Sequence, residues 1–173
     1  MNIPEVLPIV NNVAFDLYDD LGLLVVKSAT FVSLLLSRDV VKKIGLPIKE
    51  FFIWADDYEY TKRITDNGYI GLIAQDSTVY HKQDEPKNSV VDILKDKKEN
   101  AWKYFYYFRN NLYVRKQKGL IKYLFHLAYA LLVQNLQIIR YRKDAKLNYI
   151  WADIKGSLCS LFFNPKPEMI KEE

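Results

Sequence analysis

The sequence predicts an α/β region followed by a region built from helices. Two short apolar runs, 23–26 and 69–74, are bounded by turn residues, as is typical of buried strands. Segments with helical spacing, such as 37–45, lie between them, and strands that alternate with short helices favour an α/β arrangement. From residue 101 to residue 163 the apolar side chains recur at helical intervals. These three observations define the predicted fold class.

Composition divides the chain into two parts of opposite charge. The chain has 173 residues, which is enough for one full domain or for part of a larger one. Half of the residues are hydrophobic and 14% are aromatic, so a packed core is expected. The single cysteine, Cys159, excludes a disulfide framework and a Cys-based metal site. Residues 1–102 hold 12 Lys or Arg and 16 Asp or Glu, whereas residues 103–146 hold ten Lys or Arg and only Asp144.

The start of the chain and its longest uncharged run predict neither a signal peptide nor a membrane-spanning helix. Residues 1–5 lack the basic start and the apolar run of a signal peptide. The run 123–139 is interrupted by polar side chains, whereas a spanning helix needs about 20 mostly apolar residues. We therefore expect an amphipathic helix there. Asp16, Asp19 and Asp20 are predicted to be solvated turn residues in preference to a cation site.

The elements are predicted in order from local signals. Strands are expected at 23–26, 30–36, 69–74 and 77–81, and long helices at 101–119, 120–141 and 147–163. A short helix over 37–45 has Ser37 as its N-cap and Gly45 at its end. Residues 83–100 are mostly polar and are interpreted as a loop or linker. The predicted organisation is an α/β region (1–85), a linker (86–100), a helical subdomain (101–163) and a tail (164–173).

Three carboxylates stand close together in the middle of the chain, at Asp56, Asp57 and Glu59. An acidic residue at a helix start is favoured by the free N–H groups and the helix dipole, so Asp56 or Asp57 could be an N-cap. That explanation accounts for one carboxylate better than for three, because crowded acids raise one another's pKa and repel. A catalytic or ligand-binding role is the alternative hypothesis.

The basic, aromatic-rich helices predict one of two environments. Arg140, Arg142, Lys143 and Lys146 cluster at one helix end, as in interfacial helices whose cations face anionic lipid headgroups. The alternative is a helix hairpin with a solvated charged end. Nucleic acid is disfavoured, because no recognised nucleic-acid-binding motif accompanies the charge.

Several of these segments together resemble the second half of a family 2 glycosyltransferase. The segments are Thr30-Phe31-Val32, Arg38 to Pro47 with Ile44-Gly45-Leu46-Pro47, the run Phe51 to Tyr60 with Arg63, Val79-Tyr80-His81, and Tyr106-Tyr107-Phe108-Arg109-Asn110-Asn111. The resemblance covers about residues 20–163. Within that family, the chain resembles bacterial galactofuranosyl- and rhamnosyltransferases that build cell-surface polysaccharides.

The resemblance implies a partial GT-A fold, namely the acceptor-side C-terminal half followed by the helical subdomain. The family's Rossmann-like first half, with its DxD motif, binds a nucleotide sugar through a divalent metal (Mn or Mg). That half is not found in this sequence, so the isolated chain is expected to be inactive. The acceptor would be lipid-linked or a polysaccharide, and the expected location is cytoplasmic, at the inner face of the cell membrane.

The resemblance also implies roles for individual residues. Asp57 resembles the family's general base, Asp56 would position the acceptor hydroxyls or support the base, and Glu59 would orient either. Trp54 would stack on a sugar, or else be a core tryptophan.

The remaining implied roles concern the metal and the first long helix. His81 resembles a histidine that completes metal coordination in some relatives, although a structural role is the alternative. Arg109 and Asn110 would shape the acceptor site or hold the helix to the core. The rival to the glycosyltransferase hypothesis is a non-catalytic membrane-surface-binding protein with a degenerate glycosyltransferase remnant.

Overall fold

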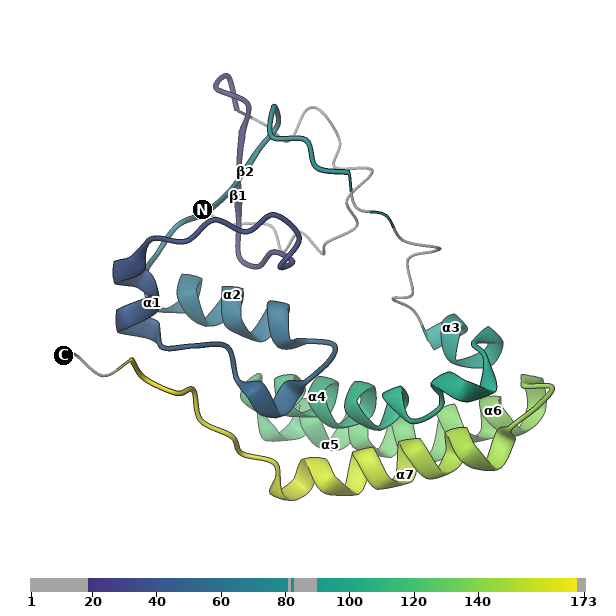
Figure 1. Cartoon of the computed structure of the whole chain (residues 1–173). Helices are drawn as coiled ribbons and strands as arrows, with labels where there is room; N and C mark the ends of the chain where they lie inside the picture. The colour runs from purple at the N-terminus through teal and green to yellow at the C-terminus, as the bar shows by residue number, and fades with distance from the viewer. Residues whose placement is uncertain (1–18, 81, 83–89, 171–173) are drawn as a thin grey trace. The chain divides into compact units, whose positions relative to one another are not determined.

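The computed structural model describes residues 19–80, 82 and 90–170, and they form a mixed α/β fold that is mostly helical (Figure 1). The predictions for Asp16 and His81 lie outside the described residues. The elements, in chain order, are β1 (Leu23–Val26), α1 (Arg38–Ile44), η2 (Lys49–Phe51), α2 (Asp56–Asp66), β2 (Gly71–Ala74), α3 (Val90–Lys95), η3 (Lys98–Asn100), α4 (Lys103–Gln117), α5 (Leu120–Ala128), η4 (Tyr129–Gln134), α6 (Asn135–Tyr141) and α7 (Lys146–Phe162). The segments η2 and η3 are 3₁₀ helices, and η4 is a π-helix.

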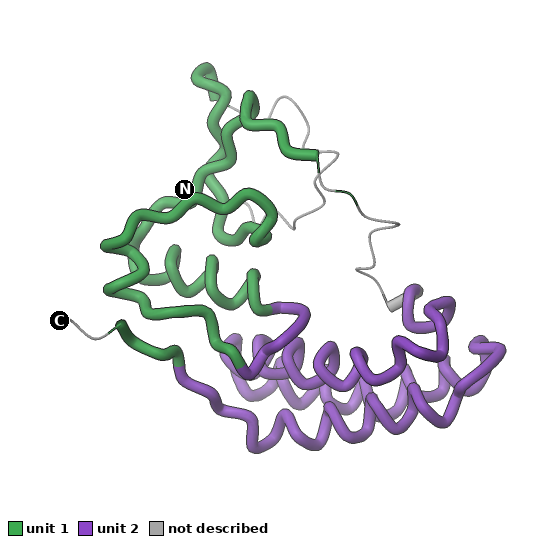
Figure 2. The backbone as a smooth tube through the Cα atoms, viewed as in Figure 1, with its two compact units in different colours: residues 1–49, 56–83, 167–173 green, residues 50–55, 84–166 purple. Residues whose placement is uncertain are grey.

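The chain forms two compact units (Figure 2). Unit 1 comprises residues 1–49, 56–83 and 167–173, and unit 2 comprises residues 50–55 and 84–166. The boundary differs from the predicted one, because the short segment before α2 belongs with the helices of unit 2.

Unit 1 contains a sheet of two strands. β1 and β2 are antiparallel, with Leu23 opposite Ala74 and Val26 opposite Gly71. Leu24 and Val26 are buried. Both strands were predicted, but a Rossmann-like half requires parallel strands joined by crossover helices. The finer prediction of a partial GT-A fold is therefore not confirmed.

The short helix α1 follows its predicted signals. The Ser37 hydroxyl accepts a hydrogen bond from the Val40 N–H at 3.3 Å, and Gly45 ends the helix with a φ of 83°. α1 and α2 share a small core of Ile44, Tyr60 and Ile64. The Tyr60 hydroxyl donates to the Gly45 carbonyl at 3.1 Å, which joins the end of α1 to α2.

The prediction of strands at 30–36 and 77–81 is wrong for the residues that the structure describes. Side-chain exposure alternates along 30–36 as it would in a strand, but this segment pairs with neither described strand. Ser33, with a φ of 59°, interrupts the extended backbone. Phe31 packs edge-on against Tyr60 of α2, with 5.9 Å between ring centroids, so this part of the run contacts a helix instead of a neighbouring strand. Residues 77–80 have no regular structure.

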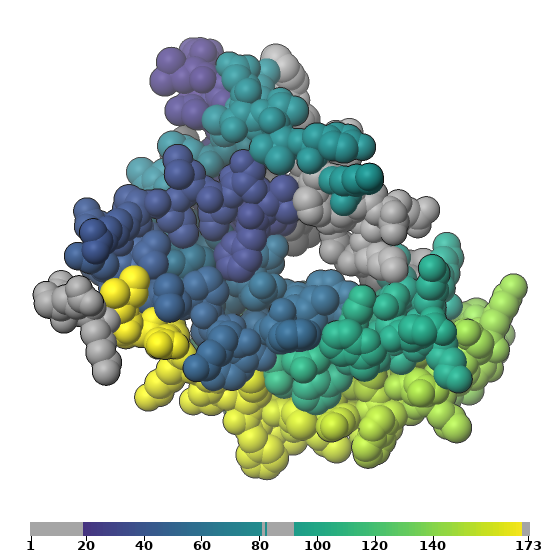
Figure 3. Space-filling view, in the orientation of Figure 1, coloured from purple at the N-terminus to yellow at the C-terminus, as the bar shows by residue number. Residues whose placement is uncertain are grey.

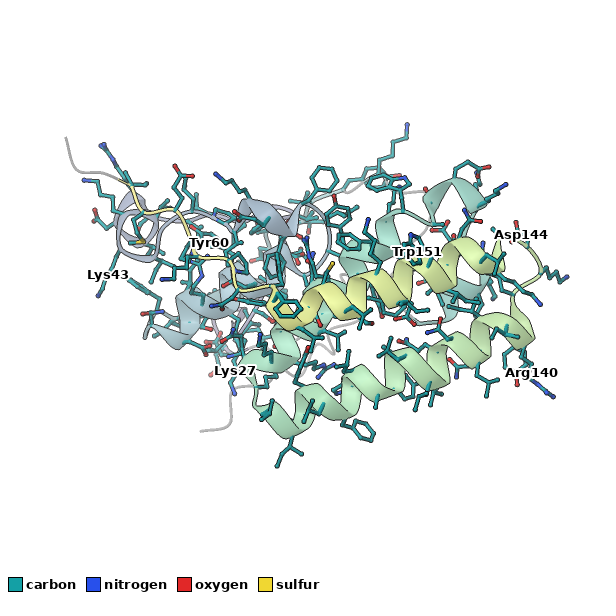
Figure 4. All side chains as sticks on the ribbon, turned by 90° about the horizontal axis from the view of Figure 1, so that it is seen from below. Lys27, Lys43, Tyr60, Arg140, Asp144 and Trp151 are labelled. Carbon is teal, nitrogen blue, oxygen red and sulfur yellow. The ribbon has the colours of Figure 1, made fainter. Side chains whose placement is uncertain are left out.

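Unit 2 is built on three helical rods that lie side by side: α4, the continuous α5–η4–α6, and α7 (Figures 1 and 4). All three were predicted, although the π-helical segment in the second was not. The buried core residues are Ile93, Ala101, Tyr104, Phe108, Ala130, Ile138, Tyr149 and Ala152. Gly156 allows α4 and α7 to approach closely, because a Cβ atom there would lie 2.5 Å from the Phe105 carbonyl oxygen.

The segment predicted to be a linker contains α3 and η3, which belong to unit 2. Arg142, which follows α6, holds them in place. Its buried guanidinium donates to the carbonyls of Ile93 and Asp96, and it stacks on Tyr149 with 3.4 Å to the ring centroid. Composition alone suggested a loop, because the partner that orders this segment lies more than forty residues away in sequence.

Candidate functional site

The three predicted carboxylates lie in the first turn of α2. The helix begins at Asp56, so Asp56 and Asp57 lie inside its first turn, where the helix dipole favours negative charge. The Asp57 carboxylate accepts a hydrogen bond from the Tyr58 N–H at 2.7 Å. Neither residue is therefore the N-cap that the simpler hypothesis expected, although the helix dipole still explains part of this acidic cluster.

Glu59 has a structural partner. It forms a two-pronged ion pair with Arg63, with distances of 2.8 Å to Nε and 3.2 Å to Nη2. Arg63 also donates to the carbonyl of Ile44 at 2.6 Å and to that of Leu46 at 3.2 Å. The pair therefore ties α2 to the end of α1. These contacts give Glu59 a role in unit 1 that requires no substrate.

Asp57 is the carboxylate best suited to accept a proton. Its side chain is half-buried, and this burial raises its pKa, to which the neighbouring charge of Asp56 adds. No Lys, Arg or His in the described chain forms an ion pair with it. A carboxylate with a raised pKa and no cationic partner is a stronger base than an exposed aspartate. Asp56, also partly exposed, stands beside it.

The backbone immediately before α2 is strained. Phe52, Trp54 and Ala55 have φ angles of 62°, 65° and 63°, in the left-handed region that L-residues avoid. Each such residue costs about 1–2 kcal/mol, so other contacts must hold the loop.

Asn110 and Arg109, on α4, supply those contacts. The fully buried Asn110 amide donates to the carbonyls of Phe51, Ile53 and Trp54, each at 2.9 Å. Arg109 donates to the Asn110 side-chain oxygen at 3.1 Å from Nε and 3.0 Å from Nη2, and Nη2 also bonds to the Glu50 carbonyl. Of the two roles predicted for Arg109 and Asn110, these contacts support holding the loop to the helix.

Trp54 packs on aromatic side chains of its own unit. Its ring centroid lies 5.2 Å from that of Tyr104 and 5.8 Å from that of Tyr107. The core alternative for Trp54 thus has direct support.

Another group of aromatics in unit 2 is more accessible. Phe52 lies 5.1 Å from Tyr106 and 6.2 Å from Trp102 between centroids, and Phe52 and Trp102 are mostly exposed. We call these three residues the aromatic patch. Sequence reasoning missed it, although Phe52 stands in the same aromatic run as Trp54.

The described residues do not form a metal site. No group of three or more His, Cys, Asp or Glu within them is arranged to hold an ion. Glu59 is engaged by Arg63, and His81 lies outside the described residues. The carboxylates of the described residues therefore do not form a site that fits a divalent metal.

The predicted basic cluster separates into a buried and an exposed part. Arg142 is a structural residue, and the Lys146 ammonium donates to the Ile139 carbonyl at 2.6 Å. Arg140 reaches outward from the end of α6 (Figure 4), and Lys143 is also exposed. Only part of the cluster is available to a partner.

Two exposed apolar stripes run along the helices of unit 2. They consist of Ile121, Phe125, Leu132, Leu136 and Ile139 on α5–η4–α6, and of Leu147, Trp151, Leu158 and Phe162 on α7. Spacings of four and seven residues place the α7 set on one side of its helix. On the other rod, Ile121 and Phe125 precede the π-helical segment and Leu136 and Ile139 follow it, and each pair is spaced by three or four residues. The space-filling view shows α7 uncovered along its outer edge (Figure 3). In the described part of the chain, no helix combines the length and the apolar character needed to cross a membrane.

Comparisons with protein-family models, with curated proteins and with solved structures gave no match to this chain.

Proposed function

We propose that this chain is the acceptor-side part of an inverting glycosyltransferase that uses a nucleotide-sugar donor. The observation that carries the proposal is Asp57, a half-buried carboxylate with a raised pKa and no cationic partner among the described residues. It stands directly after a strained loop that Asn110 holds, and strained backbone clusters at functional sites. The similarity of the stretch 51–60 to the family's acidic motif supports the same assignment.

In the proposed reaction, Asp57 acts as the general base. It takes the proton from an acceptor hydroxyl while that oxygen forms a bond to the anomeric carbon of the donor sugar. The bond between the anomeric carbon and the diphosphate oxygen breaks, and the nucleotide diphosphate leaves with the electron pair. Asp56 would orient the acceptor hydroxyls. The divalent metal that the resemblance implies would belong to the donor half of the enzyme.

The acceptor in this proposal is a lipid-linked or polysaccharide chain, and the site of action is the inner face of the cell membrane. Within unit 2, the aromatic patch exposes ring faces that could stack on a sugar, whereas Trp54 packs on Tyr104 and Tyr107.

The proposal predicts that Asp57→Asn abolishes transfer without unfolding the protein. The substitution removes the base and relieves repulsion from Asp56, so stability should be unchanged or slightly higher. Loss of a general base lowers rates by about 10²–10⁴-fold. The measurement is the sugar composition of cell-surface polysaccharides and glycolipids after the substitution is made in the native cell. The purified variant is melted in parallel.

The matched control is Asp66→Asn, which removes the same charge from the exposed end of α2. One sugar component should be lost in Asp57→Asn and retained in Asp66→Asn. Unchanged composition in Asp57→Asn, or in a deletion of the whole chain, would refute the glycosyltransferase assignment.

A second candidate function is that of a non-catalytic protein that binds an anionic membrane surface. The two apolar stripes favour it, because contiguous exposed apolar surface of this kind marks contact with a membrane or another protein. The exposed cations Lys122, Arg140, Lys143 and Lys155 lie on or beside the same helices and suit anionic headgroups. Both candidate functions allow contact with a membrane. Only sugar transfer that depends on Asp57 therefore distinguishes the enzyme from the non-catalytic protein.

A further inference from the structure

A cavity of about 220 Å³ lies in unit 2 between α4 and the rod α5–η4–α6. Its polar lining consists of Tyr107, Asn111, Arg115, His126, Tyr129 and Gln134. Phe108, Leu112 and Ala130 supply its apolar wall. None of these residues belongs to the acidic cluster or to the loop before α2, so the cavity is independent of the proposed catalytic function.

The π-helical segment shapes this cavity. A π turn holds about one residue more than an α turn, which shifts the register of every residue after it. The shift brings Gln134 to the same side of the rod as His126, eight residues earlier. π-helical segments within α-helices are frequent at functional sites. The Asn135 amide supports this one by donating to the Leu131 carbonyl at 3.1 Å.

Several polar side chains of the cavity have no hydrogen-bond partner among the described residues, although the Asn111 amide donates to the Tyr107 carbonyl at 2.8 Å. In the described chain, the side chains of Arg115, His126 and Tyr129 form no hydrogen bond or ion pair. Gln134 is only 6% exposed, and its amide likewise bonds to nothing among the described residues. The Gln134 amide is not among the fully buried side-chain groups that lack a partner, so it still reaches solvent and is available to a ligand in the cavity.

We propose that this cavity binds a small phosphorylated organic molecule. Arg115 and His126 supply positive charge or hydrogen-bond donors, the lining contains no Asp or Glu, and the neighbouring hydroxyls and amides can complete a phosphate's hydrogen bonds. The apolar wall adjoins them, so a ligand with an apolar group beside the phosphate uses both surfaces. The volume equals that of about seven waters, which suits a phosphate with a few carbon atoms.

The test titrates phenyl phosphate into the full chain by calorimetry, with inorganic phosphate and phenol as the separated halves of the probe. Phenyl phosphate should bind more tightly than either half. Arg115→Gln should weaken it by about tenfold or more, because charge-assisted hydrogen bonds are lost. Gln134→Met keeps the side-chain volume and removes the amide, so it should weaken binding several-fold. Lys122→Gln on the exposed side of α5 removes the same charge outside the cavity and should have no effect.

Nuclear magnetic resonance gives a second readout, because the chain has only two histidines, His81 and His126. Burial and the charge of Arg115 lower the pKa of His126, and a bound phosphate should raise it. The other titratable groups near the cavity are Tyr107 on α4 and the two groups besides Arg115 whose charges affect the pKa of Tyr107, namely Tyr129 on η4 and Asp92 on α3.

The thermal melting of each variant shows whether it is folded. The proposal is overturned if phenyl phosphate does not bind the wild-type protein at millimolar concentration. It is also overturned if folded Arg115→Gln binds phenyl phosphate as well as wild type does.

Discussion

At the scale of single residues, the buried carboxyl of Asp153 destabilises the folded protein when it is ionised. Asp153 is fully buried in α7, and among the residues that the structure describes only one of its oxygens has a partner, the Ser157 hydroxyl at 2.8 Å. Burial raises the pKa of Asp153 from 3.8 to about 7, and the hydrogen bond from Ser157 offsets part of that rise. The folded protein therefore binds a proton that the unfolded chain releases at lower pH.

Because the folded protein binds this extra proton, we expect the stability of the fold to decrease as the pH rises. Between about pH 4 and pH 7 the folded state holds more protons than the unfolded state, so the free energy of unfolding decreases with pH by about 4 kcal/mol. Below pH 4 and above pH 7, Asp153 should add no slope. Asp153→Asn removes the charge, so it should flatten the curve and stabilise the protein above pH 7.

Urea unfolding at a series of pH values measures this dependence. Asp76→Asn, an exposed turn substitution, is the control and should leave the slope intact. If the slope persists in Asp153→Asn, it arises from other groups, and the buried carboxyl is not its source.

At the scale of elements, Arg142 joins three segments of unit 2. Its guanidinium donates to Ile93 on α3, to Asp96 beyond it and, at 2.9 Å, to the carbonyl of Asp144 before α7. An arginine can reach several carbonyls at once because its donors form a rigid planar fork.

Arg142→Lys should therefore lower the free energy of unfolding by about 2–4 kcal/mol, because an ammonium leaves buried carbonyls without donors. Chemical denaturation measures the loss, and the exposed Arg140→Lys should change stability by less than about 0.5 kcal/mol. Hydrogen exchange should become faster in α3 than in α4. Equal stability of Arg142→Lys and wild type would show that this network contributes little.

The elements that the sequence predicted well are those specified by local signals. Ser37 and Gly45 bound α1 by capping, which needs no distant partner. The helices of unit 2 follow from periodicity over many residues. The run 30–36 had the composition and alternation of a strand, yet a strand also needs a neighbour, and composition does not reveal one. The same limit explains α3, whose order depends on Arg142.

The candidate site was predictable to a similar degree. Crowded carboxylates are visible in sequence, so Asp56 and Asp57 were found as candidates, and the structure adds the burial that distinguishes Asp57. The loop strain and the hydrogen bonds of Asn110 depend on φ angles and on contacts across more than fifty residues, which no spacing reveals. The phosphate cavity was missed because its residues come from two helices and from a π-helical register shift.

At the scale of the whole molecule, the exposed apolar and cationic side chains of unit 2 indicate what kind of surface it contacts. The predicted cationic cluster is smaller than expected, because Arg142 is buried, whereas the apolar surface is larger. Trp151 is 64% exposed and Phe162 is 89% exposed on the same side of α7. Apolar contact, with the cations in support, is thus the stronger reason to expect membrane binding.

We accordingly expect the protein to bind vesicles that contain anionic phosphatidylglycerol. Trp151→Gln with Phe162→Gln should weaken binding more than about tenfold, because each large apolar side chain contributes about 1.5–3 kcal/mol when buried. Arg140→Gln with Lys143→Gln should remove the preference for anionic over neutral lipid, since each cation near the surface contributes about 1 kcal/mol. The aromatic control Tyr80→Gln lies in unit 1, is as exposed as Phe162 and should bind as wild type does. Co-sedimentation at low and high salt measures both terms, because salt weakens only the electrostatic one. If the Trp151 and Phe162 variant binds vesicles as well as wild type does, another surface contacts the lipid. If the wild-type protein does not bind vesicles, the membrane prediction is wrong and a protein partner becomes the explanation for the apolar stripes.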